Sequence, residues 1–128
     1  MKMDLKALIA QLLKTDFLIE SGTDANGWTY KKYSSGIFEA EKEWQIGQYT
    51  INTTEVSPIK VGGDLTITTP ADMISGSVTA SIQGNTQNSP VFLEHYAATK
   101  VRIAKVTTSN ITIQGMYLYL KTVNGRWK

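Results

Sequence analysis

The amino-acid sequence predicts a mainly β fold, in which a short N-terminal helix is followed by an antiparallel β-sandwich or barrel. Apolar residues recur every three or four positions near the N-terminus, and after Gly27 they alternate with polar residues instead. The alternating segments are short and are separated by Gly, Asn and Ser, which is typical of antiparallel folds. We expect a helical stem over residues 1–20, a linker over 21–27 and a β-sandwich domain over 28–128.

The first segment, MDLKALIAQLLK, has an apolar stripe at helical spacing, and Asp4 is suited to cap its start. A helix of about three turns is marginal in water, so something must cover its stripe. The stripe either packs on the chain's own domain or associates with other copies in a short parallel bundle. In the second case, the oligomer interface contains Leu5, Leu8, Ile9 and Leu12.

Period-two alternation marks a series of short strands after the loop SGTDANG. We expect strands over residues 28–33, 37–44, 48–53, 59–61, 65–69, 78–82, 100–107 and 110–123. In the last of these, Ile113 and Met116 have opposite parity although both are apolar. Gly115 lies at the change of phase, which predicts a β-bulge or a sharp bend there.

The composition excludes several classes of protein. The chain has 128 residues, with 13 basic and 11 acidic residues that form no basic cluster, so we expect no nucleic-acid partner. It has no Cys, which excludes disulfides and thiolate chemistry. No apolar run approaches the length of a membrane span, so we expect no membrane insertion and no obvious export signal.

The segment GWTYKKYSSGIFEAEKEW is predicted to form a hairpin with a three-residue loop at Ser34-Ser35-Gly36. Gly36 then adopts a left-handed conformation, and Lys31 faces Glu39 across the pair. This register also places Thr29 opposite Glu41 and Tyr30 opposite Ala40. It gathers four aromatic residues on one face, where we expect them to form core: Trp28, Tyr30, Phe38 and Trp44.

Glu39, Glu41 and Glu43 alternate along the second arm of this hairpin, and their role has two interpretations. Two carboxyl groups about 5–10 Å apart across a bound sugar are the machinery of a glycosidase. A row of carboxylates on one side of an amphipathic strand is also the ordinary solvated face of a sheet. We favour the solvated face, because nothing in the sequence places the three residues in different environments.

The remaining candidates for chemistry are weaker. His95 is the only histidine, and no spacing of carboxylates around it suggests a metal site. No GxSxG motif occurs, and the pair Gly62-Gly63 does not open a helix that would cradle a phosphate. We therefore predict no catalytic residue, no metal and no cofactor.

A ligand-binding site is predicted most simply at the longest polar loop, QGNTQNSP, because loops carry recognition on β scaffolds. Its amides at Asn85, Gln87 and Asn88 suit sugar hydroxyls. Tyr96 beyond the loop is suited to stack on a pyranose. An ordinary solvated turn remains the simpler interpretation, and in an oligomer the loop would be free to contact a neighbouring subunit.

The hairpin resembles a segment found at the end of tail structural proteins of phages and prophages of Gram-positive bacteria. The shared pattern is an aromatic-x-Tyr, a basic residue, an aromatic, a turn with Gly, an apolar and an acidic residue, and a nearby Trp. Here these are Trp28, Tyr30, Lys31, Tyr33, Gly36, Ile37, Glu39 and Trp44. The chain departs from the pattern at Tyr33, where the family often has Trp, and near Ala40-Glu41, where it often has Cys or Trp-Gly. The segment ITIQGMYLYLKTVNGRWK resembles the last strand of such domains.

This resemblance implies a siphophage-type tail-fibre or receptor-binding tip domain, a jelly-roll-like β-sandwich that forms a homotrimer behind a helical stem. Its expected partners are other phage tail proteins and a host-surface saccharide or protein. Its expected location is the virion or the cytoplasm of a bacterium that carries a prophage. The resemblance carries over no catalytic residue. The alternative is a carbohydrate-binding module or a weak glycan hydrolase.

Overall fold

A computed structural model describes Leu5, residues 16–84 and residues 91–128, and every element in this part of the chain is a β-strand. Side chains are described for the same residues except 83 and 84. The strands are β1 (Leu18–Thr23), β2 (Thr29–Tyr33), β3 (Ile37–Val56), β4 (Ile59–Gly62), β5 (Leu65–Thr66), β6 (Ser75–Gly84), β7 (Val91–Ala97), β8 (Lys100–Val106) and β9 (Ile111–Arg126). The prediction of a mainly antiparallel β fold is confirmed.

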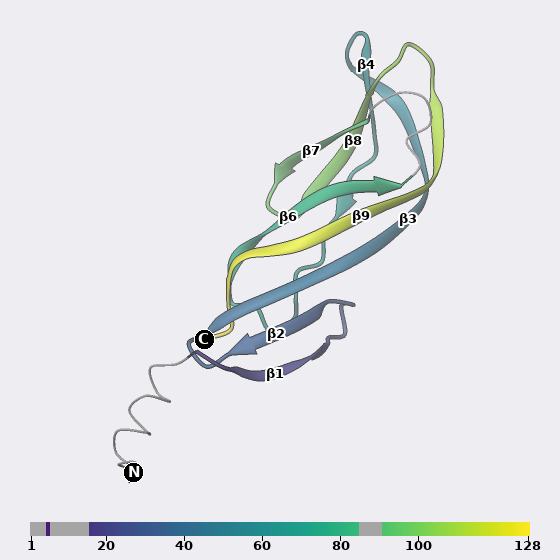
Figure 1. Cartoon of the computed structure of the whole chain (residues 1–128). Coiled ribbons are helices and arrows are strands. Elements are labelled where there is room, and N and C mark those ends of the chain that lie inside the picture. The colour runs from purple at the N-terminus through teal and green to yellow at the C-terminus, as the bar shows by residue number, and fades with distance from the viewer. Residues whose placement is uncertain (1–4, 6–15, 85–90) are drawn as a thin grey trace.

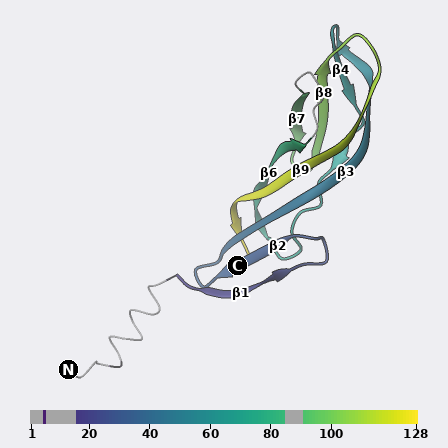
Figure 2. The same cartoon turned by 45° about the vertical axis from the view of Figure 1, so that its right-hand side comes forward.

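The strands belong to one nine-stranded sheet, so the two-sheet, jelly-roll-like sandwich is not confirmed. β3 and β9 are the longest strands and pair with each other over most of their length. β2 and β4 lie on the other side of β3, β6 lies beside β9, and β8 joins β4 to β5 and β7. The sheet curls so that β8 packs over β3, β6 and β9, which Figures 1 and 2 show from two sides.

The apolar residues of this curled sheet form two clusters that follow one another along β3 and β9. The first contains Trp28, Phe38, Ala40, Ile67, Val78, Val101, Leu118 and Leu120. The second contains Tyr49, Ile51, Ile103, Ile113 and Met116. We call the end with β1, β2 and the C-terminus basal, and the end with the β3–β4 turn distal (Figure 1). The first cluster is accordingly the basal cluster and the second is the distal cluster.

The register of the β2–β3 hairpin is the predicted one. Thr29 pairs with Glu41, Tyr30 with Ala40 and Lys31 with Glu39. Gly36 has a φ of +100°, the left-handed conformation that the three-residue loop requires. The prediction held because opposite charges and large aromatic residues both favour this register over its neighbours.

The bulge predicted in β9 is also confirmed. Tyr49 pairs with Ile113 and Gly47 with Met116, so β9 gains a residue between these pairs. Gly115 lies in this interval with a φ of +72°. The extra residue lets Ile113 and Met116 both face the core in spite of their opposite parity.

The predicted boundaries at the N-terminal side are wrong where the structure describes them. Leu18–Thr23, which were assigned to the stem and the linker, form β1 and pair with β2. Gly22 lies opposite Tyr30, and the tyrosine ring lies against its backbone. The rest of the predicted stem, apart from Leu5, Asp16 and Phe17, lies outside the described residues.

The largely buried side chain of Lys32 attaches β1 to the rest of the domain. The Lys32 ammonium lies 2.7 Å from Glu20 Oε2 of β1 and 2.6 Å from Asp72 Oδ2, and it sits over the rings of Tyr30 and Trp127. The hydrogen bonds to Asp72 and Glu20 raise the pKa of Lys32 above its ordinary value. Pairing with β2 and the ion pair of Lys32 with Glu20 hold LIESGT as a strand, although its polar residues are typical of a loop.

Two further differences concern single elements. The strands predicted over 37–44 and 48–53 are one strand, because β9 pairs with β3 on both sides of Gly47. β7 was not predicted, because Phe92 and Leu93 interrupt the alternation that identifies a strand.

Within the described residues, no helix is long and apolar enough to cross a lipid bilayer.

Candidate functional site

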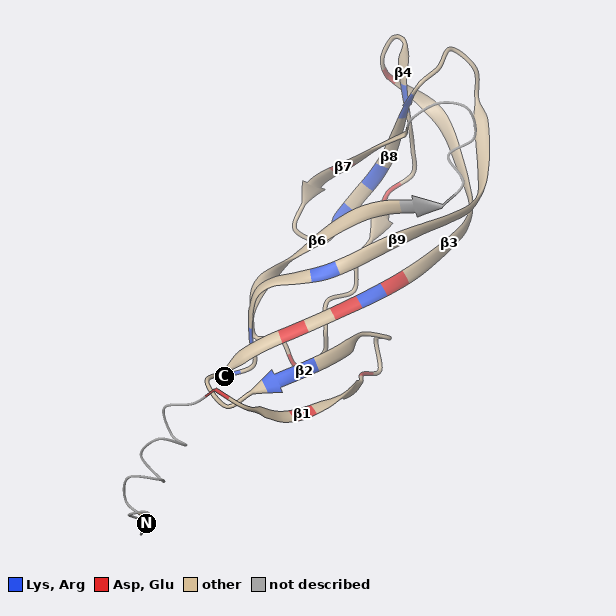
Figure 3. Cartoon of the chain, in the orientation of Figure 1, with Lys and Arg blue, Asp and Glu red and all other residues tan. Residues whose placement is uncertain are grey.

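The face of the β2–β3–β9–β6 layer that points away from the core is polar and exposed. The register of the strands places Lys31, Glu39, Glu41 and Lys121 on it, followed by Glu43 and Tyr119. Figure 3 shows that acidic residues recur along the basal part of β3. Glu39, Glu41 and Glu43 are all exposed, so the prediction that they form the solvated side of a strand is confirmed.

A groove opens on this face at a break in the β3–β9 ladder. Phe38 pairs with Gly125 and Glu41 pairs with Lys121, so two residues of β3 lie opposite three residues of β9. The Thr122 side chain fills the break: Ala40 N–H donates to Thr122 Oγ1 at 2.9 Å, and the hydroxyl donates to the Ala40 carbonyl at 3.3 Å. A hydroxyl thus replaces the backbone partners that Ala40 would have in a regular ladder.

The groove has a volume of about 540 Å³, within the range of ligand-binding sites, and it is open to solvent. Its lining combines residues from three strands. These are Thr29 and Lys31 of β2, Ile37 to Glu41 of β3, and Lys121, Thr122, Asn124, Gly125 and Arg126 of β9. Ammonium, guanidinium, carboxylate, amide and hydroxyl groups therefore converge on one opening.

Tyrosine hydroxyls hold two of the three carboxylates. Tyr119 Oη donates a short hydrogen bond to Glu41 Oε2, and Tyr33 Oη donates to Glu39 Oε2 at 3.3 Å. The bond to Glu41 raises the pKa of Tyr119, and partial burial raises the pKa of Tyr33. Lys31 and Lys121 form no ion pair within the described residues, so both ammonium groups remain available to a ligand.

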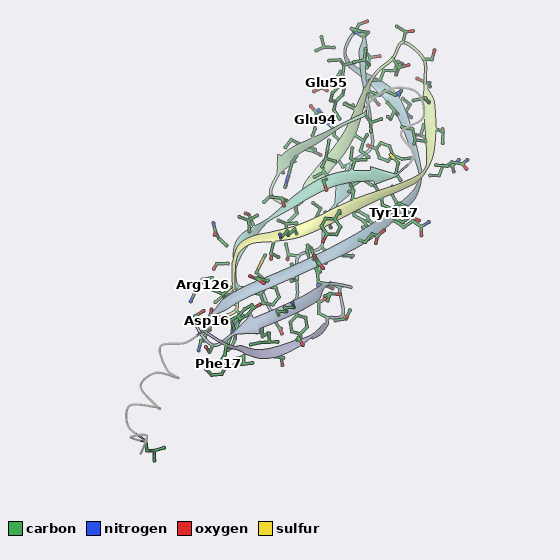
Figure 4. All side chains as sticks on the ribbon, viewed as in Figure 1. Asp16, Phe17, Glu55, Glu94, Tyr117 and Arg126 are labelled. Carbon is green, nitrogen blue, oxygen red and sulfur yellow. The ribbon has the colours of Figure 1, made fainter. Side chains whose placement is uncertain are left out.

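The basal end of the groove is anchored by Arg126, which lies beside Asp16 and Phe17 in Figure 4. Its guanidinium donates to the Ser35 carbonyl at 2.8 Å, and Trp127 N–H donates to the Gly36 carbonyl at 3.0 Å. These bonds attach the end of β9 to the hairpin turn. The basal end of the groove is therefore held by hydrogen bonds between the end of β9 and the hairpin turn.

Of the predicted ligand-binding residues, Tyr96 does not line this groove, and the other three lie outside the described part of the chain. Asn85, Gln87 and Asn88 are among residues 85–90, which the structure does not describe. Tyr96 is half exposed at the end of β7, and the Arg102 guanidinium lies 5.1 Å from its ring centroid. One face of that ring is therefore already occupied by a cation, which leaves less of it for stacking on a sugar.

Arg102 itself is held by two carboxylates that Figure 4 labels. Its Nε lies 2.6 Å from Glu94 Oε2, and its Nη2 lies 3.0 Å from Glu55 Oε1. The hydrogen bond to Glu94 raises the pKa of Arg102 above its ordinary value. This cluster ties β3, β7 and β8 together, and its charges are already matched within the protein.

His95 lines a second, smaller pocket of about 140 Å³ with Met73, Val78 and Thr99. Its Nε2 lies 3.3 Å from the Ala98 carbonyl oxygen. Among the described residues, no group of three or more His, Asp or Glu side chains is arranged to hold a metal ion.

Sequence reasoning missed the β9 side of the groove. Lys121, Asn124 and Arg126 line it only because β9 pairs there with residues of β3 that are 80 or more positions away in the chain. The pair Asn124-Gly125 was the available signal. It resembles a turn, but here Asn124 has a φ of +53° inside a strand, where it forms the irregularity that opens the groove.

Comparison of the chain with protein-family models, with curated proteins and with solved structures found no significant match.

Proposed function

We propose that this chain is a non-enzymatic binding domain of a phage or prophage tail. In this proposal it forms a homotrimer through its N-terminal stem and adheres to a saccharide or protein of the host surface. The single observation that carries the binding role is the groove over β2, β3 and β9. It supplies two lysines that form no ion pair with any described residue, together with amide, hydroxyl and carboxylate groups from three strands.

The chemistry of the groove suits a polar ligand. Sugar hydroxyls and peptide groups both donate and accept hydrogen bonds, and the lining offers both kinds of partner. The lining has three cationic side chains, Lys31, Lys121 and Arg126, beside the carboxylates of Glu39 and Glu41, so the groove has no strong charge of either sign. A neutral or zwitterionic ligand matches this balance.

The assignment to a phage tail rests on the resemblance of the hairpin. Several of the residues that carry the resemblance fix the basal half of the domain. Trp28 is buried, Tyr30 stacks on Phe38 with 5.9 Å between ring centroids, and Gly36 forms the turn. The shared pattern therefore describes a way of building this β domain, while the ligand depends on the exposed residues beside it.

A non-enzymatic role is supported by the environment of the carboxylates. Glycoside hydrolysis requires one carboxyl group to act as an acid while the other is ionised, which depends on different surroundings. Glu39, Glu41 and Glu43 share one exposed row, and two of them accept hydrogen bonds from tyrosines.

The alternative is a carbohydrate-binding module or a weak glycan hydrolase, and the position of Glu39 and Glu41 on the groove favours it over other enzymes. Residues two apart on a strand lie about 7 Å from each other, which is within the range for paired carboxylates. Incubation with host cell wall and measurement of released reducing sugar separates the two functions. Release by the wild type that is lost in Glu41→Gln would establish the hydrolase.

Binding to host cells and to a glycan array tests the proposed function. We expect the double variant Lys31→Ala, Lys121→Ala to bind at least tenfold more weakly than the wild type, with an unchanged melting temperature. Lys100→Ala is a matched control, because Lys100 is also exposed on a strand but lies on β8. A wild type that binds neither cells nor glycans would leave the chain without the adhesive role.

The loop at residues 85–90 remains a separate predicted binding site. A triple variant, Asn85→Ala, Asn88→Ala, Tyr96→Ala, measured in the same assay, distinguishes it from the groove. Weaker binding in this variant together with full binding in the lysine double variant would move the site from the groove to the loop.

A further inference from the structure

The basal end of the domain carries apolar side chains that nothing in the described part of the chain covers. Phe17, Leu18 and Ile19 are consecutive, and they are 47%, 48% and 47% exposed. Leu18 pairs with Tyr33, which lies opposite Ile37 in the hairpin register, and Ile37 is 39% exposed. We call Phe17, Leu18, Ile19, Tyr33 and Ile37 the basal patch.

Three consecutive exposed apolar residues are unusual in a strand that has one wet side, because alternate side chains point to opposite faces. Here the register shifts between Leu18 and Glu20, so Ile19 is the extra residue of a bulge. Because of this bulge, and because β1 lies at the edge of the sheet, the described residues cover the apolar side chains on neither face of β1. The apolar surface at this end is thus wider than one face of a strand.

β1 also has a free backbone edge. Among the described strands it pairs only with β2. Proteins usually protect such an edge with charged side chains, since an open edge invites pairing with another chain. The one charge on β1 is Glu20, and its carboxylate is occupied by Lys32. The edge is therefore unprotected beside an apolar patch.

The position of this patch on the chain indicates what covers it. Ser35 N–H donates to Asp16 Oδ1 at 3.0 Å and Ser34 N–H donates to the Phe17 carbonyl at 2.9 Å, so the chain enters the domain at the basal patch. The leucine stripe of the predicted stem ends at Leu13, four residues before Phe17. Four residues span at most about 14 Å, so copies joined through the stem have their basal patches close to the same axis.

We propose that the basal patch is an interface between copies of this chain, which packs Phe17, Leu18 and Ile19 of neighbouring subunits together below the stem. This inference rests on the proposed function, because it takes the trimer formed by the stem as its starting point. It adds that the β domain itself contributes to association. A parallel arrangement brings the same patch of each copy to the axis, so a single set of apolar residues is sufficient.

Sedimentation velocity of the full chain over a range of concentrations tests this interface. We expect the wild type to have about three times the chain mass of 14.2 kDa at micromolar concentration. Ile19→Asp is expected to raise the concentration at which the trimer dissociates by at least tenfold, because it places a charge among apolar neighbours. Val106→Asp is the matched control: Val106 is 55% exposed at the end of β8 and lies at the distal end.

Circular dichroism and the melting temperature show whether each variant is folded, and Ile19→Val keeps the apolar surface and is expected to associate like the wild type. A cysteine provides a second measurement, because the chain has none of its own. After mild oxidation, Ile19→Cys is expected to give a disulfide-linked dimer on a non-reducing gel, whereas Val106→Cys is expected to give none.

The outcomes separate this inference from the proposed trimer. A monomeric wild type would overturn both. A wild-type trimer whose dissociation is unchanged by Ile19→Asp would overturn the basal interface and leave the stem as the whole interface. A monomer in which the thiol of Ile19→Cys resists a maleimide reagent would show that residues 1–15 of the same chain cover the patch.

Discussion

At the scale of single residues, Trp28 connects the basal core to the loops around it. Its side chain is fully buried, and its indole Nε1–H donates to the Thr68 carbonyl at 2.7 Å. Its backbone N–H donates to Asp24 Oδ1 at 2.9 Å, and Asp24 Oδ2 accepts a hydrogen bond from Ala71. One buried ring and one carboxylate thus join two loops that are 40 or more positions apart in the sequence.

Replacement of Trp28 by Ala is expected to lower the free energy of unfolding by about 3–5 kcal/mol, which is typical of a large buried aromatic residue. Trp44 is a suitable comparison, because it belongs to the same cluster but is only half-buried. We expect Trp44→Ala to cost less than Trp28→Ala in urea denaturation. Equal costs would contradict the difference in burial.

Asp16 is the second residue with a measurable role, since it holds the hairpin turn from outside. A backbone hydrogen bond from Ser35 lowers the pKa of Asp16 below its ordinary value of 3.8. A carboxyl group whose pKa is lower in the folded state stabilises the fold above the ordinary pKa, and this contribution is lost as the pH falls through the lowered value.

We therefore expect Asp16→Asn to reduce the loss of melting temperature between pH 5 and pH 2, relative to the wild type. At neutral pH the same variant is expected to melt at a lower temperature. Glu43→Gln is the control, because Glu43 is also an exposed carboxylate but lies within β3, away from the hairpin turn. If both variants changed the pH profile equally, Asp16 would have no special role.

At the scale of elements, β9 shows what local patterns can predict. The change of parity between Ile113 and Met116 was visible in the sequence, and Gly115 identified the position of the bulge. The break at Asn124-Gly125 was not identified, because it depends on pairing with Phe38 and Ala40 of a distant strand. Local signals thus predicted the bulge and missed the groove.

The same reasoning explains β1. Hydrophobic periodicity cannot distinguish the end of a helix from a short edge strand when the following residues are Glu, Ser, Gly and Thr. Pairing with β2 and the ion pair of Lys32 with Glu20 decide the matter, and neither contact is visible in the periodicity of residues 18–23 alone. The hairpin register was predictable because opposite charges and large aromatic residues on its two arms favour one register.

Replacement of Gly115 by Ala tests the bulge. A β-carbon at this position meets no atom within 4 Å, so the variant changes the backbone energy alone. We expect it to destabilise the protein by about 1–2 kcal/mol, because an L-residue is strained at a positive φ. Gly63 also has open space but no positive φ, so Gly63→Ala is expected to be neutral or slightly stabilising in the same denaturation experiment.

At the scale of the whole molecule, one continuous sheet and two linked clusters define the fold. Ile46, Leu65, Ile82 and Leu93 pack against both clusters, so the clusters share part of their surface. In the distal cluster, Tyr49 Oη donates to the Gly63 carbonyl at 2.7 Å and accepts from Ile103 N–H at 3.1 Å, and burial raises the pKa of this hydroxyl. These hydrogen bonds stabilise the distal half, and the four shared packing residues couple it to the basal half.

This coupling predicts a single cooperative unfolding transition. Trp28, Trp44 and Trp127 all belong to the basal cluster or pack against it, so tryptophan fluorescence reports on the basal half. Far-UV circular dichroism reports on all strands. At one fixed protein concentration, we expect the two urea curves to coincide. Fluorescence that changes at a lower urea concentration than circular dichroism would show that the two halves unfold separately.

The attachment of both chain ends to one turn has a mechanical consequence. The Phe17 carbonyl accepts a hydrogen bond from Ser34 N–H, and Trp127 N–H donates to the Gly36 carbonyl. The start of β1 and the end of β9 are therefore both attached to the same three-residue loop. A force that pulls on the chain through Asp16 and Lys128 is carried by this loop and by the Arg126 guanidinium bound to Ser35. The distal cluster lies outside that path of tension. Under load, the basal bonds would break first, while the distal half of the sheet would keep its shape.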